Sequence, residues 1–233
     1  MRLFLVLAAV LAVSPTAFAQ QTEQVRAQKC FDKIDTDAEG AYQDALSWLA
    51  TTPNPAARQC AAMALVALGQ ADEGAAQLEA LAGAPDAGGA EAKAAYFGQA
   101  GNAWLVAHEP QKAVDALSHA LELRPTDGEL FKDRARARIA LKQWADAGKD
   151  LDNALAFSAV DAEAYRMRGL ALLKLNRLTE AWGDVNEAMK LAPKDVNVLL
   201  LRGDVREAMR LAGIDDPAGL DAVTEPHTRI VGN

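Results

Sequence analysis

Hydrophobic and small residues recur in this chain with helical spacing, and the helical pattern itself repeats. Residues 162–195 show it most clearly: Tyr165, Gly169 and Leu172 are separated by four and three positions and share one helix face. After a polar break, a second apolar face follows and ends at Pro193. Proline cannot continue a helix, because it lacks an N–H group and its ring clashes with the preceding turn. The pattern predicts two antiparallel helices joined by a short turn.

Equivalent positions lie 34 residues apart over consecutive segments, which is typical of a repeat architecture rather than of a single globular core. Small residues let two helices approach closely, and bulky residues fill the space between helix pairs. The repeated columns are Phe97, Phe131, Tyr165 and Leu199; Gly101, Ala135, Gly169 and Gly203; Ala113, Ala147 and Ala181; Leu117, Leu151 and Val185; and Ala120, Ala154 and Ala188.

Two polar signals predict where individual helix pairs begin. Thr126 followed by Glu129 has the spacing of a capping box, in which the two residues satisfy each other's backbone N–H groups. Asp195 is a predicted N-cap for the helix that follows it.

The order of an aromatic residue or leucine, a small residue, then Ala, a bulky residue, Ala and Pro resembles the signature of the tetratricopeptide repeat family. The resemblance implies an all-α fold, a right-handed superhelix of stacked antiparallel helix pairs. An alanine-rich bundle without such stacking is the alternative. The expected organisation is a signal peptide over 1–19, a degenerate hairpin over 20–54, a divergent repeat with a short insertion over 55–93, three repeats over 94–127, 128–161 and 162–195, a capping helix over 196–212 and a loosely ordered tail over 213–233.

The N-terminal residues have the pattern of a secretory signal. Arg2 precedes an apolar run from Leu3 to Val13, and Ala17 and Ala19 provide a small-residue cleavage site. The run is short for a membrane span, and polar residues follow it at once. We predict cleavage after Ala19 and an exported, periplasmic or secreted protein without stable membrane insertion; a retained membrane anchor is the alternative.

Charge argues against nucleic acid as a partner. The chain has 24 basic and 32 acidic residues and a formal net charge of −8. Cleavage would remove Arg2 and no acidic residue, so 23 basic and 32 acidic residues would leave −9. Nucleic-acid binding requires a concentrated basic face, which this balance disfavours.

The two cysteines, Cys30 and Cys60, lie on the predicted first helices of two successive hairpins. In an oxidising compartment an even, small number of cysteines favours pairing. Successive hairpins stack, so a disulfide between these residues is expected. Two separate buried thiols are the alternative.

In tetratricopeptide proteins the first helix of each pair lines an inner groove that commonly holds a peptide. The corresponding positions here are Asn102, Lys132, Arg136, Arg166, Leu170 and Asp204. Lys132 and Arg136 are four residues apart on one helix face, which predicts a basic groove for an acidic segment or a terminal carboxylate. The full clamp of chaperone-binding relatives is absent. The alternative is a solvated face balanced by Glu129, Asp133 and Glu163.

Catalytic and metal-binding signals are missing from the sequence. The three histidines, His108, His119 and His227, have no partner at metal-ligand spacing, and no nucleophile elbow, P-loop or dinucleotide fingerprint occurs. We therefore expect no enzyme activity, metal or cofactor. The expected function is a noncatalytic scaffold of the cell envelope that binds a polypeptide. The alternatives are self-association as a structural module and carriage of a small or carbohydrate ligand on Trp104 and Tyr96.

Overall fold

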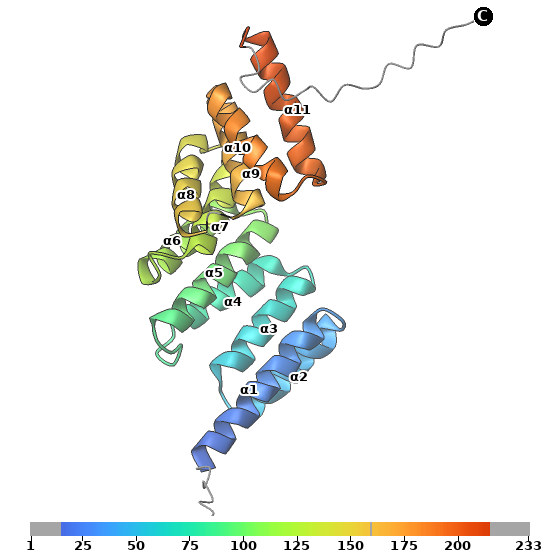
Figure 1. The fold of residues 1–233 in the computed structure, drawn as a ribbon. Coiled ribbons are helices and arrows are strands. Elements are labelled where there is room, and N and C mark those ends of the chain that lie inside the picture. Colours follow the sequence, from blue (N-terminus) through green and yellow to red (C-terminus); the bar gives the residue numbers. More distant parts are fainter. Residues whose placement is uncertain (1–14, 159, 215–233) are drawn as a thin grey trace, which may run out of the picture. The chain divides into compact units, whose positions relative to one another are not determined.

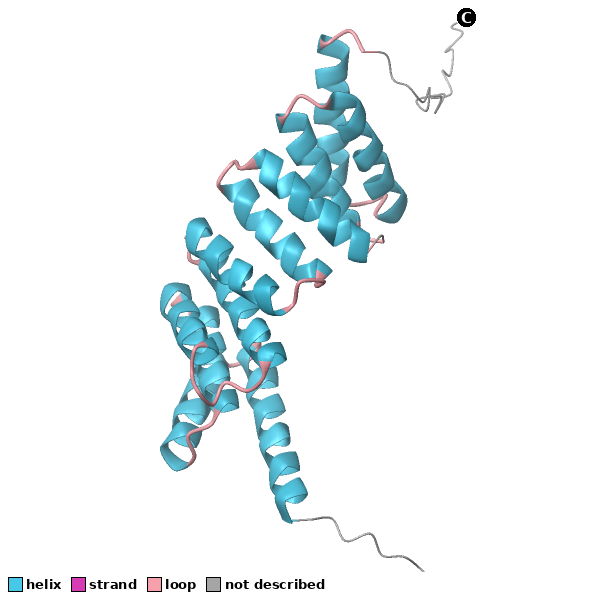
Figure 2. Cartoon of the chain, turned by 90° about the vertical axis from the view of Figure 1, so that its left-hand side faces the viewer, coloured by secondary structure: helices cyan, strands magenta, loops and turns pink. Residues whose placement is uncertain are grey.

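The computed structural model describes residues 15–158 and 160–214, and every regular element in that part of the chain is a helix. The chain divides into two compact units, one ending at His108 and the other beginning at Glu109. Figures 1 and 2 show the helices of each unit joined by short loops. No helix within the described ranges is long and apolar enough to cross a membrane.

The first unit contains five helices among its described residues. Each packs against the next, and α1 and α5 also pack against α3. The helices are α1 (Pro15–Ile34), α2 (Ala38–Thr51), α3 (Pro55–Ala67), α4 (Ala71–Ala82) and α5 (Ala90–Val106). Residues 90–93, expected within an insertion, form the first turn of α5.

The second unit contains six helices up to Ile214, again packed in chain order. In addition, α9 contacts both α7 and α11, as expected for the first helices of stacked pairs. The helices are α6 (Pro110–Leu123), α7 (Gly128–Ala140), α8 (Trp144–Phe157), α9 (Ala162–Lys174), α10 (Leu178–Leu191) and α11 (Val196–Leu211).

Aspartates at a 34-residue interval start the first helix of each pair in the second unit. Asp127 accepts hydrogen bonds from the backbone of Glu129 and Leu130 at 2.9 and 3.2 Å, so the predicted capping box at Thr126 is wrong by one residue. Asp161 accepts from the Ala164 N–H group at 3.0 Å. Asp195 caps α11, as predicted.

The turns inside the helix pairs share one backbone geometry. His108, Lys142 and Asn176, each 34 residues apart, have φ values of 59°, 58° and 57°. At Asn176, its N–H group donates to Leu173 and the N–H group of Arg177 donates to Leu172, at 3.0 and 2.9 Å. This left-handed turn ends one helix and sends the chain back along it.

The repeated columns of the sequence form the core between helices. The alanine columns and the bulky column of α8 and α10 are almost completely buried. Gly169 belongs to the small column: a Cβ atom there would lie 3.2 Å from a methyl group of Val185 and 3.5 Å from the carbonyl oxygen of Ala181. The close approach of α9 and α10 therefore leaves little room for a side chain at this position.

Cys30 of α1 and Cys60 of α3 are buried and joined as a disulfide, with their Cα atoms 6.2 Å apart. The prediction that Cys30 and Cys60 meet between the first helices of two successive hairpins is thus confirmed: the two residues lie at disulfide distance. Phe31, Ile34 and Tyr42 pack against the cysteines. The bridge joins helices at the end of the chain where the repeat pattern is weakest.

Two predictions fall largely outside the described residues. The signal peptide was placed at residues 1–19, of which only the backbone from Pro15 onward is described, as the start of α1. The tail was placed at residues 213–233, of which Gly213 and Ile214 are described.

Candidate functional site

The predicted groove residues are distributed over the first helices of the repeats. Lys132 and Arg136 lie on α7, Arg166 and Leu170 lie on α9, and Asp204 lies on α11. Asn102 lies on α5 in the first unit and is exposed. The site in the second unit is therefore built from α7, α9 and α11.

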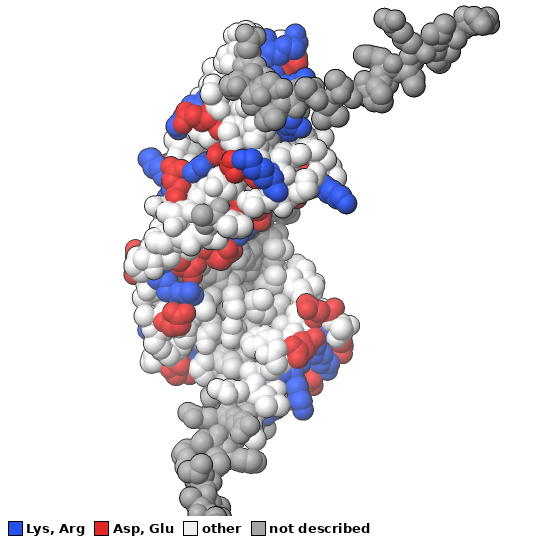
Figure 3. Space-filling model, viewed as in Figure 1, with Lys and Arg blue, Asp and Glu red and all other residues white. Residues whose placement is uncertain are grey.

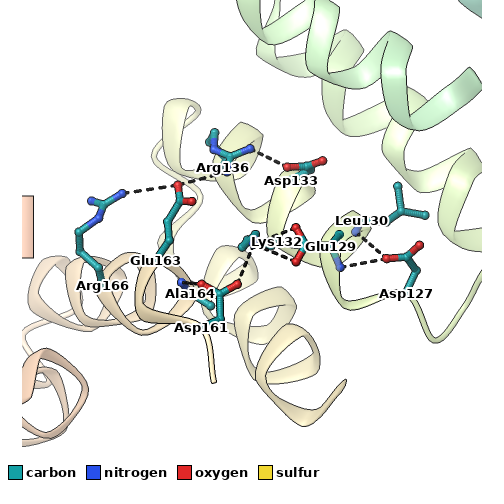
Figure 4. A network of polar contacts seen from close by, with 10 residues as sticks. All are labelled: Asp127, Glu129, Leu130, Lys132, Asp133, Arg136, Asp161, Glu163, Ala164 and Arg166. Carbon is teal, nitrogen blue, oxygen red and sulfur yellow. Dashed lines mark hydrogen bonds and ion pairs between the residues drawn. The ribbon is translucent and has the colours of Figure 1, made fainter. Parts of the chain in front are cut away.

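Lys132 links α7 to the start of α9. Its Nζ atom lies 2.7 Å from Oδ2 of Asp161 and 2.8 Å from Oε2 of Glu129 (Figure 4). Burial alone would lower the pKa of Lys132, but the hydrogen bonds to the two carboxylates outweigh it and hold this pKa above its usual value. Burial would likewise raise the pKa of Asp161, yet the Lys132 ammonium and the N–H group of Ala164 hold it below its usual value.

Arg136 makes the second bridge between α7 and α9. Its guanidinium lies 2.6 Å from Oδ1 of Asp133 and 3.2 Å from Oε1 of Glu163. Arg166 approaches the same Glu163 oxygen at 3.9 Å, so one carboxylate lies between two arginines (Figure 4). The pKa of Arg136 is raised, because Asp133 and Glu163 outweigh the opposing effect of burial.

We call this network of ion pairs the α7–α9 charged face. Its cations are Lys132, Arg136 and Arg166, and its carboxylates are Glu129, Asp133, Asp161 and Glu163. Its three cations meet four carboxylates, so its formal charge is −1 and it is not a purely basic stripe. These ion pairs involve the three carboxylates that the balanced-face alternative names, Glu129, Asp133 and Glu163. Basic and acidic side chains of the second unit are also intermixed in Figure 3.

The remaining predicted residues are not joined to this network by any described ion pair. Leu170 is half-buried and packs against the core of α10 and α11, whereas Asp204 is exposed on α11. Beside Arg166 there is a recess of about 230 Å³ between the N-terminal ends of α9 and α11. Its lining includes Glu163, Arg166 and Asn197.

A second set of charges was not identified from the sequence. The guanidinium of Arg134 on α7 donates two hydrogen bonds to Asp150 on α8, and that of Arg168 on α9 donates two to Asp184 on α10. The signal was present, because both pairs are separated by 16 residues and the two pairs are 34 residues apart.

A surface pocket of about 510 Å³ lies among α8, α9 and α10. Most of its charged groups pair with one another: Arg168 pairs with Asp152 and Asp184, and Arg177 pairs with Glu180. Lys149 pairs with Asp146, outside the pocket. No group of three potential metal ligands occurs among the described residues.

The aromatic platform proposed for a small or carbohydrate ligand is not exposed. Trp104 and Tyr96 are both more than nine-tenths buried. The indole N–H group of Trp104 donates to Glu79 at 3.0 Å. Both rings belong to the packing of the first unit, which removes the main support for a ligand carrier.

Comparison with known proteins finds similarity in structure only. No family model matches the chain, and no curated protein matches its sequence. A tetratricopeptide repeat protein from Parabacteroides merdae is 16% identical, with a TM-score of 0.66, over 82% of this chain and 74% of that one.

Two smaller solved domains are slightly more similar in sequence. The tetratricopeptide domain of Arabidopsis OM64 is 25% identical over 51% of this chain and 98% of its own, with a TM-score of 0.50. The first such domain of Spaghetti (RPAP3), solved with the HSP90 peptide SRMEEVD, is 26% identical over 52% of this chain and 95% of its own, with a TM-score of 0.50. The stacked helix pairs and these likenesses together confirm the predicted all-α solenoid of tetratricopeptide type.

Proposed function

We propose that this protein is a noncatalytic scaffold that binds a polypeptide segment through the α7–α9 charged face. The observation that carries the proposal is the position of Glu163 between Arg136 and Arg166. The side chain of Glu163 is 45% exposed, and ion pairs at such positions contribute little to stability. A carboxylate of a bound polypeptide can therefore replace Glu163 at small cost and accept hydrogen bonds from both arginines.

The ligand of a structural relative supports the same chemistry. The RPAP3 domain was solved with a peptide whose last residues, EEVD, are rich in carboxylates. In the present chain, Lys132 and Arg136 of α7 and Arg166 of α9 offer cations on two successive first helices. Leu170 and Asp204 extend the proposed site, and Asn102 is a further proposed contact in the first unit.

The proposed location is the cell envelope, after export and signal cleavage. Two features support it: the signal-like pattern of residues 1–19 and the cysteine pair, which favours an oxidising compartment. The acidic balance of the chain argues against nucleic acid as the partner.

An affinity pull-down from a cell-envelope extract tests the proposal. The test variant is Arg136→Gln with Arg166→Gln, and the matched control is Lys149→Gln with Arg177→Gln, which removes two cations from the pocket among α8, α9 and α10. We expect the wild type and the control to retain the same polypeptide. The test variant should bind it at least about tenfold more weakly, because a hydrogen bond to a charged group contributes roughly 1.5 kcal/mol or more. Equal retention by all three proteins would move the site elsewhere.

A further inference from the structure

A recess of about 360 Å³ lies between α1 and α2 of the first unit, two helices that pack against each other (Figure 1). The buried residues of its lining are Cys30 and Trp48. Its remaining lining side chains are polar and mostly basic: Arg26, Lys29 and Lys33 from α1, with Asp44 and Ser47 from α2. Three cations and one carboxylate give this lining a formal charge of +2, in a chain whose formal net charge is −8.

The polar side chains of the recess come from one face of each helix. Arg26, Lys29 and Lys33 are separated by three and four positions, so they lie above one another along α1. Asp44 and Ser47 are three positions apart on α2. The recess therefore receives charged and polar groups from two neighbouring helices.

Arg26 is held by an aromatic ring and not by a carboxylate. Its Cζ atom lies 4.8 Å from the centroid of the Trp48 ring. The ring itself is fixed, because the indole N–H group of Trp48 donates to Glu23 at 3.0 Å. Contact with an aromatic face positions a guanidinium while leaving its N–H groups available. Arg26 makes no hydrogen bond or ion pair with the described residues, so these donors are available to a ligand.

The two lysines of the recess differ in their surroundings. Lys33 pairs with Asp44 at 2.8 Å and with Asp37 at 3.6 Å, so much of its charge is balanced. Lys29 has no ion pair or hydrogen bond among the described residues, and neither does the hydroxyl group of Ser47. A guanidinium, an ammonium and a hydroxyl group can therefore all donate to one ligand in the recess.

A phosphate monoester fits this set of donors. Its three free oxygens can accept from all three groups at once, it carries between one and two negative charges at neutral pH, and a guanidinium binds such a group with two parallel hydrogen bonds. We propose that the α1–α2 recess binds a phosphate monoester through Arg26, Lys29 and Ser47. The same chemistry is offered by a soluble phosphate ester and by the headgroup of phosphatidic acid. This site is separate from the polypeptide site proposed for the second unit.

The first test is a titration of the full chain with glycerol phosphate at low ionic strength, followed by NMR at the indole N–H group of Trp48. We expect a saturable shift in the wild type. In Arg26→Gln with Lys29→Gln the dissociation constant should be at least about tenfold larger, because two charged donors are lost. The matched control, Arg58→Gln with Lys93→Gln, removes two cations from α3 and α5 outside the recess and should bind as the wild type does. Equal affinities in all three proteins, or no saturable shift, would overturn the proposal.

A second variant separates binding from an effect on folding. Asp44→Asn removes the carboxylate nearest to Lys33 and leaves three cations and no carboxylate in the lining. We expect it to bind glycerol phosphate about threefold more tightly, because a repulsive charge is gone and Lys33 is released. A destabilised first unit would not produce tighter binding. An unchanged or weaker affinity would contradict the placement of the phosphate in this recess.

Sedimentation with vesicles identifies the source of the phosphate. The vesicles contain phosphatidylcholine alone or with phosphatidic acid. Sedimentation of the protein only with phosphatidic acid, and its loss in Arg26→Gln with Lys29→Gln, would support the proposal with a lipid headgroup as the ligand. Binding of glycerol phosphate without sedimentation would support it with a soluble ester as the ligand. Sedimentation that the double variant retains would overturn the assignment of the lipid contact to this recess.

Discussion

Arg134 and Asp150 form a two-pronged ion pair between α7 and α8, with Nε and Nη2 of the arginine 3.0 and 2.7 Å from the two carboxylate oxygens. Asp150 is 2% exposed and also accepts a hydrogen bond from Arg138 at 2.7 Å. One period later, Arg168 and Asp184 repeat the arrangement. The two helices of each of these pairs are thus joined by buried charge as well as by apolar columns.

Removing Asp150 should be costly. Asp150→Ala leaves Arg134 and Arg138 without their shared carboxylate in a largely buried position, and we expect a loss of about 3 kcal/mol in the free energy of unfolding. Urea denaturation measures it. Asp146→Ala, which removes an exposed partner of Lys149 on the same helix, should change stability by less than about 0.5 kcal/mol. Equal effects of the two substitutions would contradict the structural role of Asp150.

Gly169 should not tolerate a large side chain. A leucine there would collide with Val185 and the backbone of Ala181, and we expect it to destabilise the second unit by roughly 1–3 kcal/mol or more. Gly183→Leu, on the open side of α10, should be neutral or slightly stabilising, because glycine is a poor helix former. Thermal unfolding followed by circular dichroism distinguishes the two. A fully stable Gly169→Leu protein would show that the α9–α10 register is wrong.

The Lys132–Asp161 pair should make stability depend on pH in the acid range. The pKa of Asp161 is lower in the folded protein than its ordinary value of 3.8, so its contribution is complete above that value and is lost as the pH falls toward the folded pKa. Asp161→Asn keeps a capping side chain and removes the charge. We expect the wild type to lose its advantage over this variant as urea unfolding is measured from pH 6 down to pH 3. A constant difference over that range would show that the charge of Asp161 contributes nothing.

The Cys30–Cys60 bridge should stabilise the first unit in particular. Its sequence separation of 30 residues corresponds to roughly 3–4 kcal/mol in the chain-entropy model. Cys30→Ala with Cys60→Ala should therefore lower the free energy of opening of α1–α3, measured by hydrogen exchange of their amides, while that of helices α7–α10 stays unchanged. An unchanged first unit would mean that apolar packing alone holds α1 against α3.

The sequence predicted the fold from one kind of information, the spacing of small and bulky residues. Ala147, Leu151 and Ala154 recur at a fixed period because helix contact tolerates few alternatives at those positions. The polar break between the two apolar faces of residues 162–195 corresponds to the turn at Asn176. The helix start at Asp127 was misplaced by one residue, since Thr126 is also a capping side chain by type.

The charged residues were harder to interpret. Lys132, Arg136 and Arg166 lie on two successive first helices, but their pairing with Asp161 and Glu163 depends on side-chain conformations that no repeat pattern encodes. Arg134 was overlooked because a charged residue is normally assigned to the surface. Only its repeated separation from an aspartate, 16 residues in two successive repeats, marks it as structural.

Site-specific photo-cross-linking in a cell-envelope extract tests the polypeptide-binding claim most directly. A benzophenone amino acid would replace either Asp204, exposed on α11 beyond the α7–α9 charged face, or Lys149, exposed on α8. The account predicts a polypeptide adduct from position 204, none from position 149, and loss of the first adduct when Arg136→Gln and Arg166→Gln are added. Adducts from position 149 alone, or adducts at 204 that survive both substitutions, would contradict it.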